Sequence, residues 1–70
     1  MKSLENFARN LRRLRNERKL SQEELGFQVG MHRTSINNLE SRRHSPSLKN
    51  MARIAEALGV KVDDLIQDPE

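Results

Sequence analysis

Residues 21–40 constrain the fold of this chain most, because apolar side chains recur there at helical spacing on both sides of a glycine. Leu25 and Val29 are four residues apart, so they share one face of a first helix. Ile36 and Leu39 are three apart and share one face of a second helix. Gly30 lies between the two segments and can supply the turn. The pattern predicts a helix-turn-helix over about residues 21–41.

Two further features define this pair of helices. Ser21-Gln22-Glu23-Glu24 has the spacing of a capping box, in which Ser21 accepts from the Glu24 N–H and the Glu24 carboxylate reaches back to the Ser21 backbone. Gly26 is small at a place where two steeply crossing helices need a close approach. We therefore expect the first helix to begin at the capping box and to cross the second near Gly26.

The second helix of the pair carries polar side chains on its outward positions. These are Arg33, Thr34, Asn37 and Asn38, and such side chains can hydrogen-bond to base edges in the major groove of DNA. A helix-turn-helix presents its second helix to DNA in this way. The sequence therefore predicts that these four residues contact bases.

Three more helices complete the prediction. Ser3 is expected to cap a helix that fades near Lys19, and Ser47 to cap another that stops at Gly59, before a short last helix. No segment alternates strongly enough for a strand, so we predict an all-α chain of five helices. It forms one domain over residues 1–70, with C-terminal helices over about 47–67. The predicted core consists of Leu4, Phe7, Leu11, Leu14, Leu25, Val29, Ile36, Leu39, Leu48, Met51, Ile54 and Leu58.

Charge is unevenly distributed along the chain. Residues 1–49 carry eleven Lys and Arg against five Glu, a net charge of +6, whereas residues 50–70 carry two against five, a net charge of −3. A basic front and an acidic tail suit a protein whose N-terminal part meets phosphate, and double-stranded DNA is the expected partner. A solvated charged surface explains the same numbers equally well.

Several function classes lack their usual residues. The chain has no cysteine and only two histidines, His32 and His44, so we expect no metal site. We find no nucleophile–base–orienter set and no phosphate-cradling glycine loop, and we expect neither an enzyme, a cofactor nor a small-molecule ligand. No apolar run is long enough for a membrane span and no signal-peptide pattern opens the chain, which predicts a soluble cytoplasmic protein.

The motifs, taken in order, resemble the Cro and phage-repressor class of helix-turn-helix proteins, also called the XRE family. The resemblance covers about residues 4–66 and implies a five-helix lambda-repressor-like DNA-binding domain. Small restriction–modification controller proteins are the most similar type, followed by phage-type repressors. The matching residues are Leu11-Arg12-x-Leu14-Arg15, Leu20-Ser21-Gln22-Glu23-Glu24-Leu25, Gly30, Ile36, Leu39-Glu40, Pro46-Ser47-Leu48, Ile54-Ala55-Glu56-Ala57-Leu58-Gly59-Val60 and Val62-Asp63-Asp64-Leu65-Ile66.

The resemblance implies roles for individual residues. Arg33, Thr34 and Asn38 match positions that reach base edges, whereas the resemblance places Asn37 closer to the DNA backbone or the groove wall. An arginine at the position of Arg15 pairs with a glutamate at the position of Glu40 in this family, which implies a structural ion pair between the first and third helices. The residues expected at DNA phosphates are Gln22, Ser35, Arg42, Arg43 and His44.

Three positions depart from the family pattern. Arg42 stands where members usually carry glycine, so we expect either a different loop or a compensating phosphate contact. Phe27 stands where members are usually polar; we expect it on the surface, with a partner contact as the alternative. Lys61 replaces the usual small capping residue of the last helix, which is therefore expected to fray.

We expect a sequence-specific transcription regulator that acts as a homodimer on a near-palindromic operator, closest in type to a controller protein. The small core and the apolar C-terminal end support a dimer, with an interface of Val60, Val62, Leu65 and Ile66. A phage-type repressor is one alternative. Another is a protein-interaction module, antitoxin-like or an adaptor, that has kept the fold.

Overall fold

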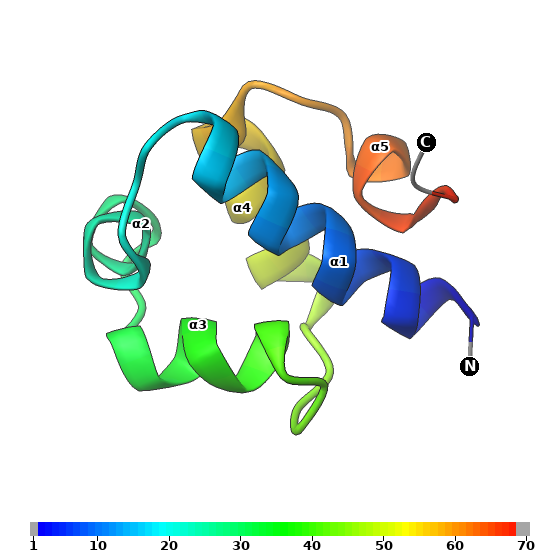
Figure 1. Cartoon of the computed structure of the whole chain (residues 1–70), viewed down its shortest axis with the longest axis horizontal. Coiled ribbons are helices and arrows are strands. Elements are labelled where there is room, and N and C mark those ends of the chain that lie inside the picture. Colours follow the sequence, from blue (N-terminus) through cyan, green and yellow to red (C-terminus); the bar gives the residue numbers. More distant parts are fainter. Residues whose placement is uncertain (1, 69–70) are drawn as a thin grey trace.

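Five helices follow one another along residues 2–68, the part of the chain that the computed structural model describes. They are α1 (Lys2–Glu17), α2 (Gln22–Val29), α3 (Arg33–Glu40), α4 (Leu48–Leu58) and α5 (Val62–Ile66). α1 crosses the middle of the molecule and packs against α3 and α5, while α2 packs against α3 and α4 (Figure 1). No strand occurs within residues 2–68, so the predicted all-α fold is confirmed.

Most of the predicted helix ends are confirmed. The Ser21 side chain accepts from the Glu24 N–H at 2.9 Å, and the Ser21 N–H donates to the Glu24 carboxylate at 2.8 Å. The hydrogen bond from the Ser21 N–H stabilises the charged carboxylate and lowers the pKa of Glu24. Ser47 caps α4, and Gly30 and Gly59 end α2 and α4 in the left-handed conformation, each with φ 71°. Ser3 does not cap α1, because the helix already begins at Lys2 and includes it.

The start of α5 lacks the usual side-chain cap, as the sequence predicts. Lys61 is the N-cap residue and its side chain accepts no hydrogen bond. Instead its backbone N–H donates to the Asp64 carboxylate at 2.9 Å. This hydrogen bond is one of the two that form a capping box, and it is made by a residue one turn into the helix.

The core is built from the apolar faces of all five helices, and the prediction for Leu48 is wrong. Leu48 is 78% exposed. It is the first residue of α4, one turn before the half-buried Met51, so the apolar face of α4 extends past the edge of the core. The buried cluster consists of Phe7, Leu11, Leu14, Leu25, Val29, Ile36, Leu39, Ile54, Ala55, Leu58 and Leu65.

Two buried asparagines, which the sequence analysis did not identify, attach α1 to the end of α5. Asn10 Nδ2 donates to the carbonyls of Leu65 and Gln67 at 3.0 and 2.9 Å. Asn6 Nδ2 donates to the Ile66 carbonyl at 3.2 Å and to the Asp68 carboxylate at 2.9 Å. The last carbonyls of a helix have no partner within it, so these amides satisfy groups that burial would otherwise leave unpaired.

This docking corrects one expectation about the dimer. Leu65 has 0% exposure because it packs inside the molecule beneath α1. It has no surface that a second copy can touch and does not belong to a dimer interface. Val60, Val62 and Ile66 are half-buried and keep part of their surface.

The predicted ion pair between Arg15 and Glu40 joins α1 to α3. Arg15 donates from Nε to Glu40 Oε2 at 2.6 Å and from Nη2 to Oε1 at 3.1 Å. Its Nη1 also donates to the Leu20 carbonyl at 2.7 Å, in the α1–α2 connection. The side chains are 13% and 0% exposed, so the pair is shielded from water.

Two further side chains, Gln22 and Arg12, contact the Glu40 carboxylate. Gln22 Nε2 donates to Oε1 at 3.1 Å, and Arg12 Nε lies 3.5 Å from the same oxygen. Burial alone would raise the pKa of Glu40, but the hydrogen bonds from Arg15 and Gln22 and the charges of Arg15 and Arg12 outweigh it and lower the pKa. Hydrogen bonding with the Glu40 carboxylate raises the pKa of Arg15.

Gly26 of α2 lies directly against the backbone of the turn that leads into α3. A Cβ placed there would overlap the Met31 carbonyl oxygen, which is backbone and cannot rotate away. The Gly26 carbonyl in turn accepts from the Met31 N–H at 2.8 Å, which closes the turn. The sequence prediction of a close approach at this glycine is confirmed.

Replacing Gly26 with alanine is expected to destabilise the protein. Alanine gains up to about 1 kcal/mol of helix propensity, but overpacking costs about 1–3 kcal/mol, and the clash here is with backbone. Chemical unfolding should therefore show a net loss. Phe27→Ala is the matched control: this side chain, on the next residue, is 88% exposed and its removal should change stability by less than about 0.5 kcal/mol. Equal stability of Gly26→Ala and the wild type would contradict the close approach.

Stability is expected to fall in acid through Glu40. Because folding lowers the pKa of Glu40, the carboxylate contributes its full stability above its ordinary value of 4.5 and loses it as the pH drops below. The free energy of unfolding should fall less steeply below pH 4.5 in Glu40→Gln than in the wild type. Glu17→Gln, which alters an exposed pair with Arg13, is the control for the removal of a surface carboxylate. Parallel curves for Glu40→Gln and the wild type would rule out this contribution.

Candidate nucleic-acid interface

α3 separates an apolar face from a polar one. Ile36 and Leu39 are buried, with 0% and 3% exposure, and pack against the other helices. Arg33, Thr34 and Asn37 are exposed on the opposite side. The structure thus brings these three predicted base-reading residues together on one outward face. Asn38 and Ser35 lie beside that face and are half-buried.

The start of α3 is capped by a histidine, a role that the sequence analysis missed. His32 Nδ1 accepts from the Thr34 N–H at 3.1 Å, and His32 itself has extended backbone angles of φ −71° and ψ 150°. The usual capping residues are Ser, Thr, Asp and Asn, so the position did not stand out. A signal was present nonetheless: His32 follows the glycine turn and directly precedes the periodic residues of α3.

Gln22 occupies the first position of α2, beside the polar face of α3. Its Nε2 donates to Glu40, and its Oε1 lies 3.5 Å from Asn37 Nδ2. The side chain is half-buried and links α2 to α3. Gln22 therefore connects the N-terminus of α2 with Glu40 and with the polar face of α3.

The turn after α3 keeps the left-handed geometry even though Arg42 replaces the usual glycine. Arg42 has φ 64°, and the Arg43 N–H donates to the Asn38 carbonyl at 2.9 Å, as in a Schellman helix end. Arg42 Nη1 pairs with Glu5 of α1 at 3.2 Å. An exposed pair contributes up to about 1 kcal/mol, which is comparable to the cost of the left-handed conformation. The loop does not differ from the norm, and Glu5 supplies a compensating contact.

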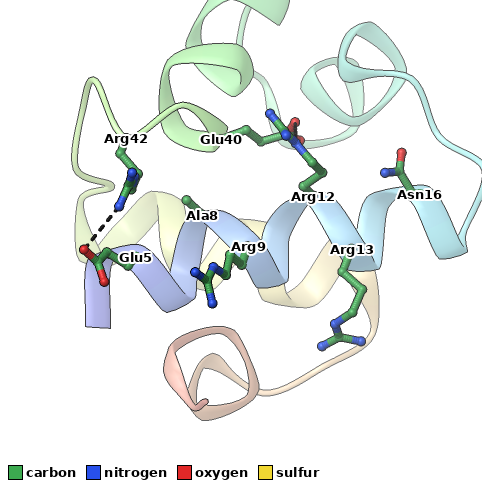
Figure 2. Close-up of a pocket in the computed structure, with 8 residues that line it drawn as sticks. All are labelled: Glu5, Ala8, Arg9, Arg12, Arg13, Asn16, Glu40 and Arg42. Atoms are coloured by element: carbon green, nitrogen blue, oxygen red, sulfur yellow. Dashed lines mark ion pairs between the residues drawn. The ribbon is translucent and has the colours of Figure 1, made fainter. Parts of the chain in front are cut away.

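A groove of about 380 Å³ lies between α1 and the end of α3 (Figure 2). One wall carries Glu5, Arg9, Arg12, Arg13 and Asn16 of α1. The other carries Glu40 and Arg42, and Arg42 pairs with Glu5 across the groove (Figure 2). Arg12 extends toward Glu40, whereas Arg9 and Arg13 extend the opposite way (Figure 2). The arginines therefore do not converge on one point. They form a positively charged surface of α1 beside α3.

Arg43 and His44 are exposed in the same loop, so the basic residues predicted at DNA phosphates lie directly after α3. Within residues 2–68 no group of three or more His, Cys, Asp or Glu side chains is arranged to hold a metal ion. Among the helices of this described part, none has the length and apolar character needed to cross a membrane.

Comparison with known proteins places this geometry in a family. The sequence model described as "Helix-turn-helix" matches residues 11–65. The control protein C.BamHI of Bacillus amyloliquefaciens is 38% identical over 61 residues, which cover 86% of this chain and 75% of that protein.

Two solved structures share the whole architecture. The hypothetical transcription factor NHTF from Neisseria superposes with a TM-score of 0.91 and 36% identity, over 96% of this chain and 77% of that one. The P22 c2 repressor protein, solved in complex with a synthetic operator, superposes with a TM-score of 0.84 and 25% identity, over 90% of this chain and 96% of that one. The resemblance to the Cro and phage-repressor class is confirmed, and this chain belongs to the helix-turn-helix family of DNA-binding transcription regulators.

Proposed function

We propose that the protein binds as a homodimer to a near-palindromic operator and reads it with α3, as a regulator of the controller-protein type. The observation that carries the proposal is the outward polar face of α3, whose opposite face is held in the core. Similarity to the control protein C.BamHI supports the type of regulator. Such a regulator acts on cytoplasmic DNA and needs no catalytic activity.

Base reading is assigned to four residues of α3. Arg33, the first residue of the helix, is exposed and can pair bidentately with a guanine. Thr34 and Asn37 are exposed beside it, and Asn38 reaches the same face from a half-buried position. A helix that enters the major groove contacts bases mainly with its N-terminal residues, which favours Arg33 and Thr34.

Phosphate contacts are assigned to both ends of this surface. Gln22 stands at the N-terminus of α2, where free N–H groups and the helix dipole favour an anion. Ser35 lies beside the reading face, and Arg43 and His44 are exposed in the following loop. Arg42 joins them only when a phosphate competes with Glu5 for its guanidinium, since the two are paired in the free protein.

The dimer is assigned to the C-terminal end of the chain. Val60, Val62 and Ile66 are half-buried apolar residues, so each retains surface that a second copy can cover. A two-fold axis there would present two α3 helices to half-sites about 34–36 Å apart.

Phe27 supports a second candidate function. It is 88% exposed on α2, whereas apolar side chains of this size are usually buried. The sequence prediction that it lies on the surface is confirmed. A protein-interaction module that keeps the fold would use Phe27 to contact its partner. A phage-type repressor, by contrast, would read DNA with the same face of α3 as a controller protein.

Selection from random duplex DNA followed by sequencing tests the proposal. We expect a two-fold symmetric motif, because a symmetric dimer presents the same surface twice. Arg33→Ala should relax the preference at one position of each half-site and cost about 1–3 kcal/mol in binding. Lys49→Ala, which removes an exposed charge from α4, is the control and should leave every base preference intact. Equal weakening by Arg33→Ala on the selected and a scrambled duplex would refute base reading.

Sedimentation equilibrium tests the dimer. The wild type should approach twice the chain mass of 8.1 kDa as its concentration rises. Val62→Lys should shift this equilibrium toward the monomer, because it places a charge in the assigned contact. Leu48→Lys, at an apolar side chain that is 78% exposed outside that contact, should leave the equilibrium unchanged. Dissociation by Leu48→Lys in place of Val62→Lys would contradict this interface.

A further inference from the structure

His32 makes two contacts with Thr34. Together they determine which ring nitrogen of His32 carries the hydrogen and where the hydroxyl hydrogen of Thr34 points. The first is the helix cap, in which the Thr34 N–H donates to His32 Nδ1 at 3.1 Å. A ring nitrogen that accepts a hydrogen bond carries no proton, so a neutral His32 has its hydrogen on Nε2. The second contact joins the same Nδ1 to Thr34 Oγ1, also at 3.1 Å.

The second contact has one favourable arrangement. Two unprotonated acceptors facing each other at this distance would repel, so the Thr34 hydroxyl must turn its own hydrogen toward Nδ1. His32 Nδ1 then accepts from both the N–H and the O–H of Thr34, as a three-centre acceptor. The hydroxyl proton is thereby engaged, and only the lone pairs of Thr34 Oγ1 remain to face outward.

We propose that His32 is a specificity-determining residue that makes Thr34 an acceptor, so that Thr34 reads an amino group on a base edge. A free Ser or Thr hydroxyl serves either as donor or as acceptor and discriminates poorly. The amino groups of adenine and cytosine are the donors of the major groove, whereas guanine N7 and O6 and thymine O4 are acceptors that would face Thr34 lone pairs. The inference rests on the base contact proposed for Thr34.

Other observations agree with this role for His32. Thr34 is exposed at the second position of α3, within the N-terminal turn that reaches base edges. The cap orders the His32 ring and the helix start together, so the hydroxyl is oriented before DNA is bound. His32 need not touch DNA itself, and it acts as a positioning residue.

The test measures relative binding of duplexes that differ at one base pair. The probe is the duplex recovered by selection, with all four base pairs placed in turn at the position whose preference Thr34→Val abolishes. The wild type should favour the base that presents an amino group by about fivefold, the equivalent of one net hydrogen bond.

Two variants of His32 separate its role as a helix cap from its contact with the Thr34 hydroxyl. His32→Gly leaves a tolerated N-cap residue but nothing to hold the hydroxyl, and its preference at this position should fall to within about twofold. His32→Asn supplies an oxygen that accepts from both Thr34 groups, and it should retain the wild-type preference. Arg33→Ala, the control, should change the preference at a different position only. Melting curves for each variant establish that it is folded.

The outcomes distinguish the role of His32 from the base contact of Thr34. An unchanged preference in His32→Gly, or a wild-type preference for a base that presents acceptors, overturns the role of His32 while the contact of Thr34 stands. If Thr34→Val changes no position while Arg33→Ala does, the proposed contact of Thr34 is wrong, and the inference falls with it.

Discussion

The hydrogen-bonded Glu40 carboxylate is the group on which the placement of α3 depends. It lies at the last residue of α3 with its side chain wholly buried, and Arg15 of α1 and Gln22 of α2 donate to its two oxygens. One group therefore ties three helices together. A buried charge is costly without partners, and removal of one partner leaves the other stranded, so the arrangement tolerates little change. This makes Glu40 a point of specificity for the geometry as well as a contributor to stability.

The two ends of α3 are held by different means. At its start, His32 closes the helix with a side-chain acceptor next to the residues expected to read bases. At its end, Arg42 takes a left-handed conformation and pairs with Glu5. Gly26 lets the turn between α2 and α3 pack directly against α2, and Arg33, Thr34 and Asn37 stay exposed on the outward face of α3. Rigid support from the core side is what a surface that reads bases by hydrogen bonds needs.

Much of this could be predicted from the sequence, because local rules and global fold agree. The capping box at Ser21, the glycines after α2 and α4, and the helical spacing of the core residues each fix an element. Leu48 and Leu65 show where periodicity stops helping: it assigns a face to a residue but does not say where the core ends or which helix covers that face. Asn10 was missed because its carbonyl partners are distant in sequence and meet it only in the folded chain, and His32 was missed because histidine is not a usual helix cap. The site residues on α3 could be proposed from their outward positions, but the links that orient them could not.

Backbone amide chemical shifts, recorded by NMR as the selected duplex is added to the wild-type protein, would test the central claim most directly. Our account predicts that the largest changes fall on residues 33–38, at the start of α2 and in the loop over residues 41–45, with α4 beyond its first turn little affected. Changes centred instead on Phe27 and the adjoining surface of α2 and α4, with α3 unperturbed, would contradict the assignment of α3 as the helix that reads DNA.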